Sequence, residues 1–155
     1  MNYEKVTLEP FYVIGISIRT NNSGGTLQQD IASLWNRFFS PNIADQIPNK
    51  VNHEIYSVYT DYESDYTGYY TTVLGCRVSS LENIPAGFMG VTIPQSAYRK
   101  YKAIGNIPDS VASVWSNIWQ SGPTINRTYT ADFDVYGEKS QLGDQSEVDV
   151  FISVG

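Results

Sequence analysis

Asp134 and Tyr136 form the pair of residues in this sequence that is best placed to do chemistry. They lie two positions apart in a segment that is otherwise typical of a strand, where aspartate is disfavoured and needs a reason. Because side chains alternate along a strand, both point to one side, while Phe133 and Val135 point to the other. A carboxylate flanked by aromatic rings suits a flat cation or the exchange of a proton.

A second segment repeats this pattern. Tyr56–Tyr59 aligns with Phe133–Tyr136, so that Ser57 and Tyr59 occupy the positions of Asp134 and Tyr136. One carboxylate, one hydroxyl and two tyrosines are therefore expected on a shared surface. If the apolar members of each segment face the helices of the protein, this shared surface lies on the opposite side of the sheet.

Two explanations of Asp134 remain open from the pattern alone. The neighbouring Asp132 favours a solvated outer face of the sheet. The alternative is a partly buried anion that selects a cation or a proton.

Two amphipathic helices are expected to position these strands. The segment Asp30–Trp35 returns 80 positions later as Ser110–Trp115, and the apolar residues around both copies recur at helical spacing. We expect one helix from Thr26, which has the form of a capping box with Gln29, to about Phe39. The second helix is expected from about Pro108 to Gln120.

The tryptophans of these helices differ in their expected roles. Trp35 and Trp115 lie at equivalent positions within the two apolar stripes, which predicts that both belong to the core. Trp119 is matched by Phe39 rather than by an indole in the first copy. Because it breaks the repeat, Trp119 is a candidate for a ligand cleft.

The remaining segments predict an α+β fold. Seven strands are expected, over residues 10–20, 54–61, 69–79, 88–93, 98–104, 127–136 and 147–154. Together with the helices they indicate duplicated β-α-β-β units, with half 1 at about 1–80 and half 2 at about 87–155. We expect a single domain over 1–155, with one antiparallel-rich sheet, two helices on one face and a ligand cleft at the pseudo-two-fold seam.

Composition restricts the classes of function. The net charge of −6 disfavours nucleic-acid binding through phosphates, and the only close basic residues, Arg99, Lys100 and Lys102, are interpreted as a solvated strand face. No apolar run approaches the roughly 20 residues that span a bilayer, and no signal peptide is expected. The single Cys76 fits a reducing compartment, so a cytoplasmic location is expected. The 12 Tyr, 6 Phe and 3 Trp favour an aromatic-lined pocket.

Other candidates for chemistry have plainer interpretations. His53 is interpreted as an exposed loop residue, because no second His and no Cys accompanies it. Cys76 is interpreted as a small buried hydrophobe. Gly24-Gly25 lacks the lysine of a phosphate loop. The acidic residues Asp61, Glu63 and Asp65 lack the calcium-loop spacing, so neither a metal nor a cofactor is expected.

The order of several phrases in this sequence resembles the GyrI-like small-molecule-binding domain, also called the AraC-type effector-binding domain, in its stand-alone form. The matching phrases cover nearly the whole chain and are Ile31–Phe38, Tyr56–Tyr62, Gly68–Gly75, Ile84–Gly87, Ile93-Pro94 with Tyr98, and Phe133–Tyr136. The resemblance implies a pair of β-α-β-β units with an aromatic cleft between the halves. Family members commonly place a glutamate in a Phe-Glu-x-Tyr phrase at the cleft floor, so Asp134 takes that role with one methylene fewer, and its shorter side chain is expected to recede from the cleft.

The resemblance implies a protein that binds small, cationic and amphipathic molecules. The expected ligand-binding residues are Asp134, Tyr136, Ser57, Tyr59, Trp119 and Tyr70. One alternative is a hydrolase of electrophilic, cyclopropane-type compounds, in which Asp134 and Tyr136 would be catalytic. Another is a protein-interaction module related to gyrase inhibitors, with a protein partner or a homodimer. The sequence favours binding over catalysis and does not name the ligand.

Overall fold

The structure, a computed structural model, describes residues 2–22, 25, 27–40, 43–65, 67–121 and 124–155. Its main elements follow the order β1 (Glu4–Leu8), β2 (Phe11–Asn21), α1 (Leu27–Phe38), β3 (Ile55–Thr60), β4 (Tyr69–Val78), β5 (Met89–Ile93), β6 (Ser96–Ile104), α2 (Asp109–Ser121), β7 (Ala131–Tyr136) and β8 (Glu147–Val154). Short 3₁₀ helices lie at Ala44–Gln46, Glu138–Gln141 and Gly143–Gln145. Both expected helices and all seven expected strands are therefore present, with small shifts at their ends.

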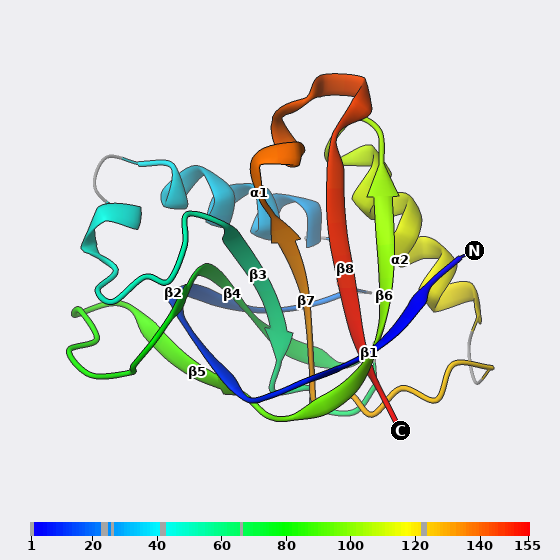
Figure 1. The fold of residues 1–155 in the computed structure, drawn as a ribbon, viewed down its shortest axis with the longest axis horizontal. Coiled ribbons are helices and arrows are strands. Elements are labelled where there is room, and N and C mark those ends of the chain that lie inside the picture. Colours follow the sequence, from blue (N-terminus) through cyan, green and yellow to red (C-terminus); the bar gives the residue numbers. More distant parts are fainter. Residues whose placement is uncertain (1, 23–24, 26, 41–42, 66, 122–123) are drawn as a thin grey trace.

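The eight strands form one sheet in the order β1-β6-β8-β7-β3-β4-β2-β5. Every pair of neighbouring strands is antiparallel. Figure 1 shows the two helices together behind this sheet. The predicted α+β class, with one antiparallel-rich sheet and two helices on one face, is confirmed.

The sheet has a pseudo-two-fold axis at its centre. If the unit β1-β2-α1-β3-β4 is exchanged with β5-β6-α2-β7-β8, the strand order reads the same from the other end. The axis therefore passes between β3 and β7, which pair in register with Ser57 opposite Asp134. These two residues are also equivalent in the sequence repeat. The site expected at the seam is thus at the one position where a residue faces its own symmetry equivalent.

One element of the predicted repeat was wrong. Each unit has four strands rather than three, because β1 was missed by the sequence analysis and β5 was not recognised as its equivalent. The two strands are also exchanged between halves, since β1 pairs with β6 and β5 pairs with β2. The five residues of β1 are largely exposed, and so they carry little of the hydrophobic alternation that identifies a strand.

Both faces of the sheet are covered by apolar side chains. On the helix face, Leu34 and Phe38 of α1 pack on β2 and β4, while Val114 and Ile118 of α2 pack on β6 and β8. The opposite face carries a second layer formed by Phe11, Val13, Tyr56, Val58, Val73, Ile93, Tyr98, Phe133 and Phe151. Residues of the edge strands β1 and β5 pack against this layer. The helices therefore cover only one of two buried surfaces.

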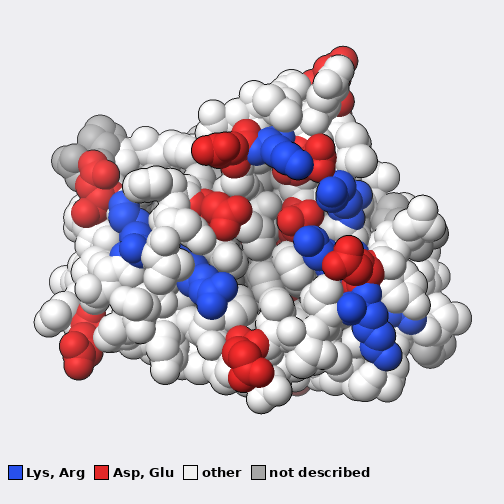
Figure 2. Space-filling view, viewed as in Figure 1, with Lys and Arg blue, Asp and Glu red and all other residues white. Residues whose placement is uncertain are grey.

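The surface charges are interspersed. On the face turned to the viewer in Figure 2, basic and acidic groups lie next to one another. Lys100 and Lys102 form ion pairs with Asp149 and Glu147, and Arg99 lies over the ring of Tyr3. The interpretation of these basic residues as a solvated strand face agrees with this arrangement. In the part of the chain that the structure describes, no helix is long and apolar enough to cross a membrane.

Two glycines determine how closely β2 and β4 approach. Gly15 and Gly75 are register partners, and a Cβ atom on Gly75 would collide with the backbone carbonyl of Ile14. Backbone atoms cannot move aside without opening the strand pair. We therefore expect Gly75→Ala to lower the free energy of unfolding by roughly 2–4 kcal/mol, as overpacking does in a core.

Chemical denaturation measures this effect, and Gly90→Ala is the matched control. The atoms nearest to a Cβ on Gly90 would be side-chain atoms of Ile84 and Leu81, which can rotate away. Equal losses for Gly75→Ala and Gly90→Ala would contradict the proposed backbone collision.

Candidate functional site

The centre of the candidate site is the carboxylate of Asp134 in β7. Its side chain is fully buried. The hydroxyl of Tyr59 donates a hydrogen bond to Oδ2 at 2.7 Å, and the indole Nε1 of Trp115 donates one to Oδ1 at 3.0 Å. The hydroxyl of Ser57 in turn donates to the Tyr59 oxygen at 3.1 Å. Asp134 is therefore held by one donor from β3 and one from α2. Both donors are neutral groups.

The side of the sheet on which this group lies corrects the sequence analysis. Asp134 and Tyr136 face the helices, because Asp134 contacts Trp115 of α2 and Tyr136 contacts Trp35 of α1. Phe133 instead belongs to the apolar layer on the opposite face. The predicted alternation of side chains is confirmed. The predicted side is wrong, because apolar residues are buried on both faces of the sheet and therefore do not indicate which face the helices cover.

Burial changes the acidity of the site. It raises the pKa of Asp134 to about 7, although the hydrogen bonds from Tyr59 and Trp115 act in the opposite direction. Burial also raises the pKa of Tyr59 and of Tyr136 well above the ordinary value, and the nearby Asp134 adds to both shifts. The two phenols therefore stay protonated as donors, while the carboxyl group exchanges its proton near neutral pH.

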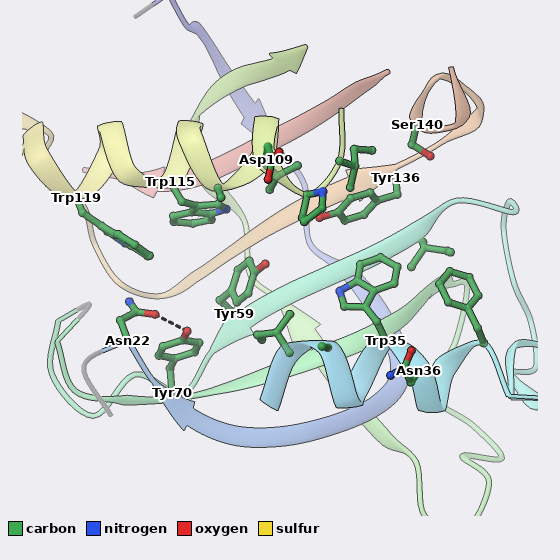
Figure 3. Close-up of a pocket in the computed structure, with 18 of the residues that line it drawn as sticks. Asn22, Trp35, Asn36, Tyr59, Tyr70, Asp109, Trp115, Trp119, Tyr136 and Ser140 are labelled. Atoms are coloured by element: carbon green, nitrogen blue, oxygen red, sulfur yellow. Dashed lines mark hydrogen bonds between the residues drawn. The ribbon is translucent and has the colours of Figure 1, made fainter. Parts of the chain in front are cut away.

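A cavity of about 970 Å³ opens above this group, between the two helices. Figure 3 shows Trp35 from α1 and Trp115 and Trp119 from α2 directed into the space over the central strands. The walls are formed mainly by aromatic and apolar residues, and they include Ile31, Trp35, Phe39, Ile55, Tyr59, Tyr62, Tyr70, Ile107, Pro108, Val111, Trp115, Trp119 and Tyr136. A cavity of this size and lining is typical of a site for a drug-sized molecule.

The rings of the wall contact one another edge to face. Tyr59 lies 5.3 Å from Trp115 and 6.1 Å from Tyr70, measured between ring centroids, and both contacts are T-shaped. Trp35 meets Tyr136 in the same way at 4.9 Å. The hydroxyl of Tyr70 donates to Asn22 at 2.6 Å, as Figure 3 also shows. These contacts hold several ring faces in position around the cavity.

The structure divides the six expected ligand-binding residues into two groups. Tyr136, Tyr59, Tyr70 and Trp119 line the cavity. Ser57 and Asp134 are buried beneath it and contribute no surface to its wall. This placement agrees with the expectation that the short aspartate side chain recedes from the cleft.

The expected core role is confirmed for Trp115 and is wrong for Trp35, and both residues also line the cavity. Trp115 is buried, yet it lines the cavity and binds Asp134 through its indole nitrogen. Trp35 is half-buried and also lines the cavity. The equivalent indoles of the repeat thus form opposite walls of the site, which their position in an amphipathic stripe did not reveal.

A second buried carboxylate was also misinterpreted. Asp132, which favours a solvated face in the sequence, has a fully buried side chain. It accepts hydrogen bonds from Tyr62 and from Arg127, and it pairs with Arg127 at 2.8 Å. Strand alternation places Asp132 on the same side as Asp134, which could have predicted its burial once Asp134 was assigned there. No sequence pattern indicated Arg127.

The other candidates for chemistry agree with their plainer interpretations. His53 is exposed, and so are Asp61, Glu63 and Asp65. Cys76 is buried, and burial raises the pKa of its thiol, which disfavours the reactive thiolate. The Gly24 position and the capping residue Thr26 lie outside the described residues.

Comparison with known proteins identifies relatives along the whole chain. The model of the family Cass2, integron-associated effector binding protein, matches residues 5–154. The protein YobU of Bacillus subtilis (strain 168), provisionally described as a transcriptional regulator, is 25% identical over 143 residues. That match covers 90% of this chain and 89% of YobU.

Solved structures have the same fold. The integron cassette protein VCH_CASS2 from the mobile metagenome of Vibrio cholerae superposes with a TM-score of 0.78 at 25% identity, covering 99% of this chain and 95% of that protein. The protein SAV2435, solved bound to tetraphenylphosphonium, superposes with a TM-score of 0.82 at 20% identity. In that case 100% of this chain and 94% of SAV2435 are covered.

The raised pKa of Asp134 predicts a stability effect. Between the unfolded value near 4 and the folded value of about 7, the folded state keeps a proton that the unfolded state releases, so the stability contributed by this group falls as pH rises. Asp134→Asn mimics the protonated acid. It should leave stability unchanged near pH 4 and raise the free energy of unfolding by roughly 2–4 kcal/mol at pH 8.

Urea unfolding at several pH values measures the difference between the two proteins. The exposed Asp144 provides the control, because Asp144→Asn removes an equal charge without touching a buried site. A constant difference between Asp134→Asn and the unmodified protein from pH 4 to pH 8 would contradict the raised pKa.

Proposed function

The chain belongs to the Cass2 family of integron-associated effector binding proteins, and we propose that it binds amphipathic aromatic cations in the cavity between α1 and α2. Membership of this family confirms the resemblance to stand-alone GyrI-like effector-binding domains that the sequence indicated. The family is one of small-molecule effector binding. The chemistry of the ligand has to come from the cavity itself.

The observation that carries the proposal is an aromatic cavity directly above a buried carboxylate. Ring faces attract cations by roughly 0.5–2 kcal/mol each, and Tyr59, Tyr70 and Trp119 offer such faces. The carboxylate of Asp134 adds charge selection. A neutral or anionic ligand of the same size would gain only the apolar contacts.

Asp134 would act on a ligand through space rather than by direct contact. Its carboxylate lies behind the Tyr59 hydroxyl and the Trp115 indole, which bind it at 2.7 and 3.0 Å. A cation about 6 Å from the carboxylate gains roughly 3 kcal/mol at an effective dielectric constant near 20. Because no directed bond to the ligand is required, cations of different shape can be accepted.

A solved relative of the same fold supports this class of ligand. SAV2435 has been solved bound to tetraphenylphosphonium, a lipophilic aromatic cation. That ligand has no hydrogen-bonding group, so its recognition depends on size, ring contacts and charge. The cavity of this chain offers the same three properties.

The alternative functions have less support from the site. Catalysis by Asp134 and Tyr136 on an electrophilic substrate would require the carboxyl group to reach a reacting atom, and Asp134 has no surface on the cavity wall. A protein-interaction role does not account for the aromatic cavity. A cytoplasmic location, suggested by the single cysteine, is part of the proposal.

Charge selection can be tested with two probes of nearly equal size and opposite charge. Tetraphenylphosphonium should bind the unmodified protein, while tetraphenylborate should bind at least about 100-fold more weakly, because Asp134 attracts one and repels the other. Asp134→Asn should weaken phosphonium binding about 100-fold at pH 8, and it should reduce the difference in affinity between the two probes. Quenching of tryptophan emission, with Trp35, Trp115 and Trp119 in the wall, measures the affinities.

Asp144→Asn is the control for a change in net charge, because Asp144 is exposed in a 3₁₀ helix. If Asp134→Asn and Asp144→Asn change phosphonium affinity equally, the buried carboxylate does not select the ligand.

Binding should also depend on pH. The carboxylate form of Asp134 attracts the cation, and the pKa of about 7 means that this form decreases as pH falls below neutrality. Tetraphenylphosphonium, which has no titratable group, should therefore bind more weakly at pH 6 than at pH 8 and release close to one proton at pH 6. Calorimetry in buffers of different ionisation enthalpy counts the proton. Release of a proton by Asp134→Asn as well would assign the effect to another group.

A further inference from the structure

Two equivalent indoles line opposite walls of the cavity. Trp35 of α1 and Trp115 of α2 occupy the same position in the sequence repeat. Trp115 meets Tyr59 in a T-shaped contact, with 5.3 Å between the ring centroids. Trp35 meets Tyr136, the equivalent of Tyr59, in a T-shaped contact at 4.9 Å. The two indoles are therefore placed alike on the central strands.

Only one of these indoles has its N–H bonded. Nε1 of Trp115 donates to Asp134 at 3.0 Å. The equivalent of that acceptor in the other half is Ser57, whose oxygen is one atom closer to the main chain and whose hydroxyl donates to Tyr59 at 3.1 Å. Among the described residues, none accepts a hydrogen bond from Nε1 of Trp35. The difference between Ser57 and Asp134 thus leaves one indole donor unused.

The unused donor has accessible surface. The side-chain nitrogen and oxygen atoms of the described residues that are both buried and unpaired belong to Thr72, Tyr98, Ser110 and Arg127. Nε1 of Trp35 is unpaired and is not one of them, so this nitrogen is not buried. Trp35 as a whole is half-buried and lines the cavity, and Figure 3 shows its indole nitrogen turned toward the space between the helices. A group in the cavity can therefore reach this N–H.

A ligand without an acceptor would leave this donor unsatisfied. An accessible N–H is hydrated in the free protein, and a ligand that fills the cavity displaces that water. A donor that loses water without gaining another partner costs free energy. Such a site discriminates against ligands that lack an acceptor at this position, and tetraphenylphosphonium lacks one.

The charges around the cavity select a neutral acceptor. The carboxylate of Asp134 is bonded to two residues of the cavity wall, and it repels an anionic group on a ligand. The indole N–H of Trp35 is a donor without net charge, so it cannot offset the desolvation of an anion. A carbonyl oxygen accepts the hydrogen bond without either cost.

We propose that Trp35 is a specificity-determining residue whose Nε1–H donates to a neutral carbonyl-type acceptor, so that the preferred ligands are aromatic cations that carry such an acceptor on the side of α1. This inference rests on the proposed function, because it places the acceptor in the same cavity as the cation. It adds one directional contact to a site that otherwise selects by size, rings and charge.

Matched phosphonium probes test the acceptor position. Triphenylphosphonium ions whose fourth phenyl ring carries an acetyl group are compared with ions that carry an isopropenyl group, which has nearly the same shape and no acceptor oxygen. The substituent is placed at the 3 or the 4 position, so that two directions of approach are sampled. In at least one pair the unmodified protein should bind the acetyl probe about tenfold more tightly at pH 8. Equal affinities within each pair would overturn the inference.

The variant Trp35→Phe assigns the preference to the indole. It removes the N–H and keeps a ring that can pack against Tyr136. Calorimetry should show that this variant still binds tetraphenylphosphonium and no longer prefers the acetyl probe. Trp119→Phe is the matched control, because it removes another indole from the wall of the same cavity. It should keep the preference of the unmodified protein. A preference that survives in Trp35→Phe, or one that is lost in Trp119→Phe, would contradict the assignment.

Indole N–H signals test the bond in the unmodified protein. The chain has 3 Trp, so the ¹⁵N-labelled protein gives one indole signal for each, assigned from contacts with neighbouring rings. In the free protein the N–H of Trp35 should exchange with water faster than that of Trp115, which is bonded to Asp134. The bound acetyl probe should shift the Trp35 proton downfield of its position with the isopropenyl probe. The same Trp35 position with both probes would refute the hydrogen bond.

A neutral pair of probes separates this inference from the proposed function. 4-Acetylbiphenyl and 4-isopropenylbiphenyl have nearly the same shape, but only the ketone carries an acceptor. If no phosphonium binds, while the ketone is preferred by the unmodified protein and not by Trp35→Phe, the acceptor site stands and the cation proposal fails. If phosphonium ions bind and no matched pair shows a preference, the cation proposal stands and the acceptor site is wrong.

Discussion

The burial of one carboxylate on the pseudo-two-fold axis organises this protein. Asp134 has no solvent contact, and it is kept in place by hydroxyl and indole donors rather than by a cation. Those donors, Tyr59 and Trp115, come from β3 and α2, so the sheet and one helix must meet at this point. The same residues line the cavity. The residues that bury Asp134 in the core are therefore the same residues that build the site.

The position of Asp134 also explains why the two halves of the repeat differ. On the axis a residue faces its own equivalent, and Ser57 is the register partner of Asp134. Two aspartates there would bring two carboxylates together away from water, which is strongly unfavourable. A serine avoids that conflict and supplies a hydroxyl that supports Tyr59. The duplicated fold can thus hold a single central anion only if its two copies diverge at this position.

The sequence predicted what depends on local patterns. Apolar spacing located both helices, and alternation grouped Ser57, Tyr59, Asp134 and Tyr136 on one surface, as the structure has them. It could not decide which face the helices cover, because alternation is equally satisfied on either side of a sheet with two buried faces. Asp132 was misjudged for the same reason. The burial of Arg127 depends on contacts with Asp132 and Tyr129, which are formed only in the folded chain.

The exchange of the outermost strands between the two units has a consequence for folding during synthesis on the ribosome. β1 is made before the other strands of this sheet, but its partner β6 begins at Ser96, after the whole of the first unit. The central pair must likewise wait for β7 at Ala131–Tyr136. Such long-range pairing slows folding, and partly made sheets expose edges that other chains can join. The emerging segment therefore lacks its final sheet until β7 and β8 have been made, and this interval is its period of greatest exposure to misassembly.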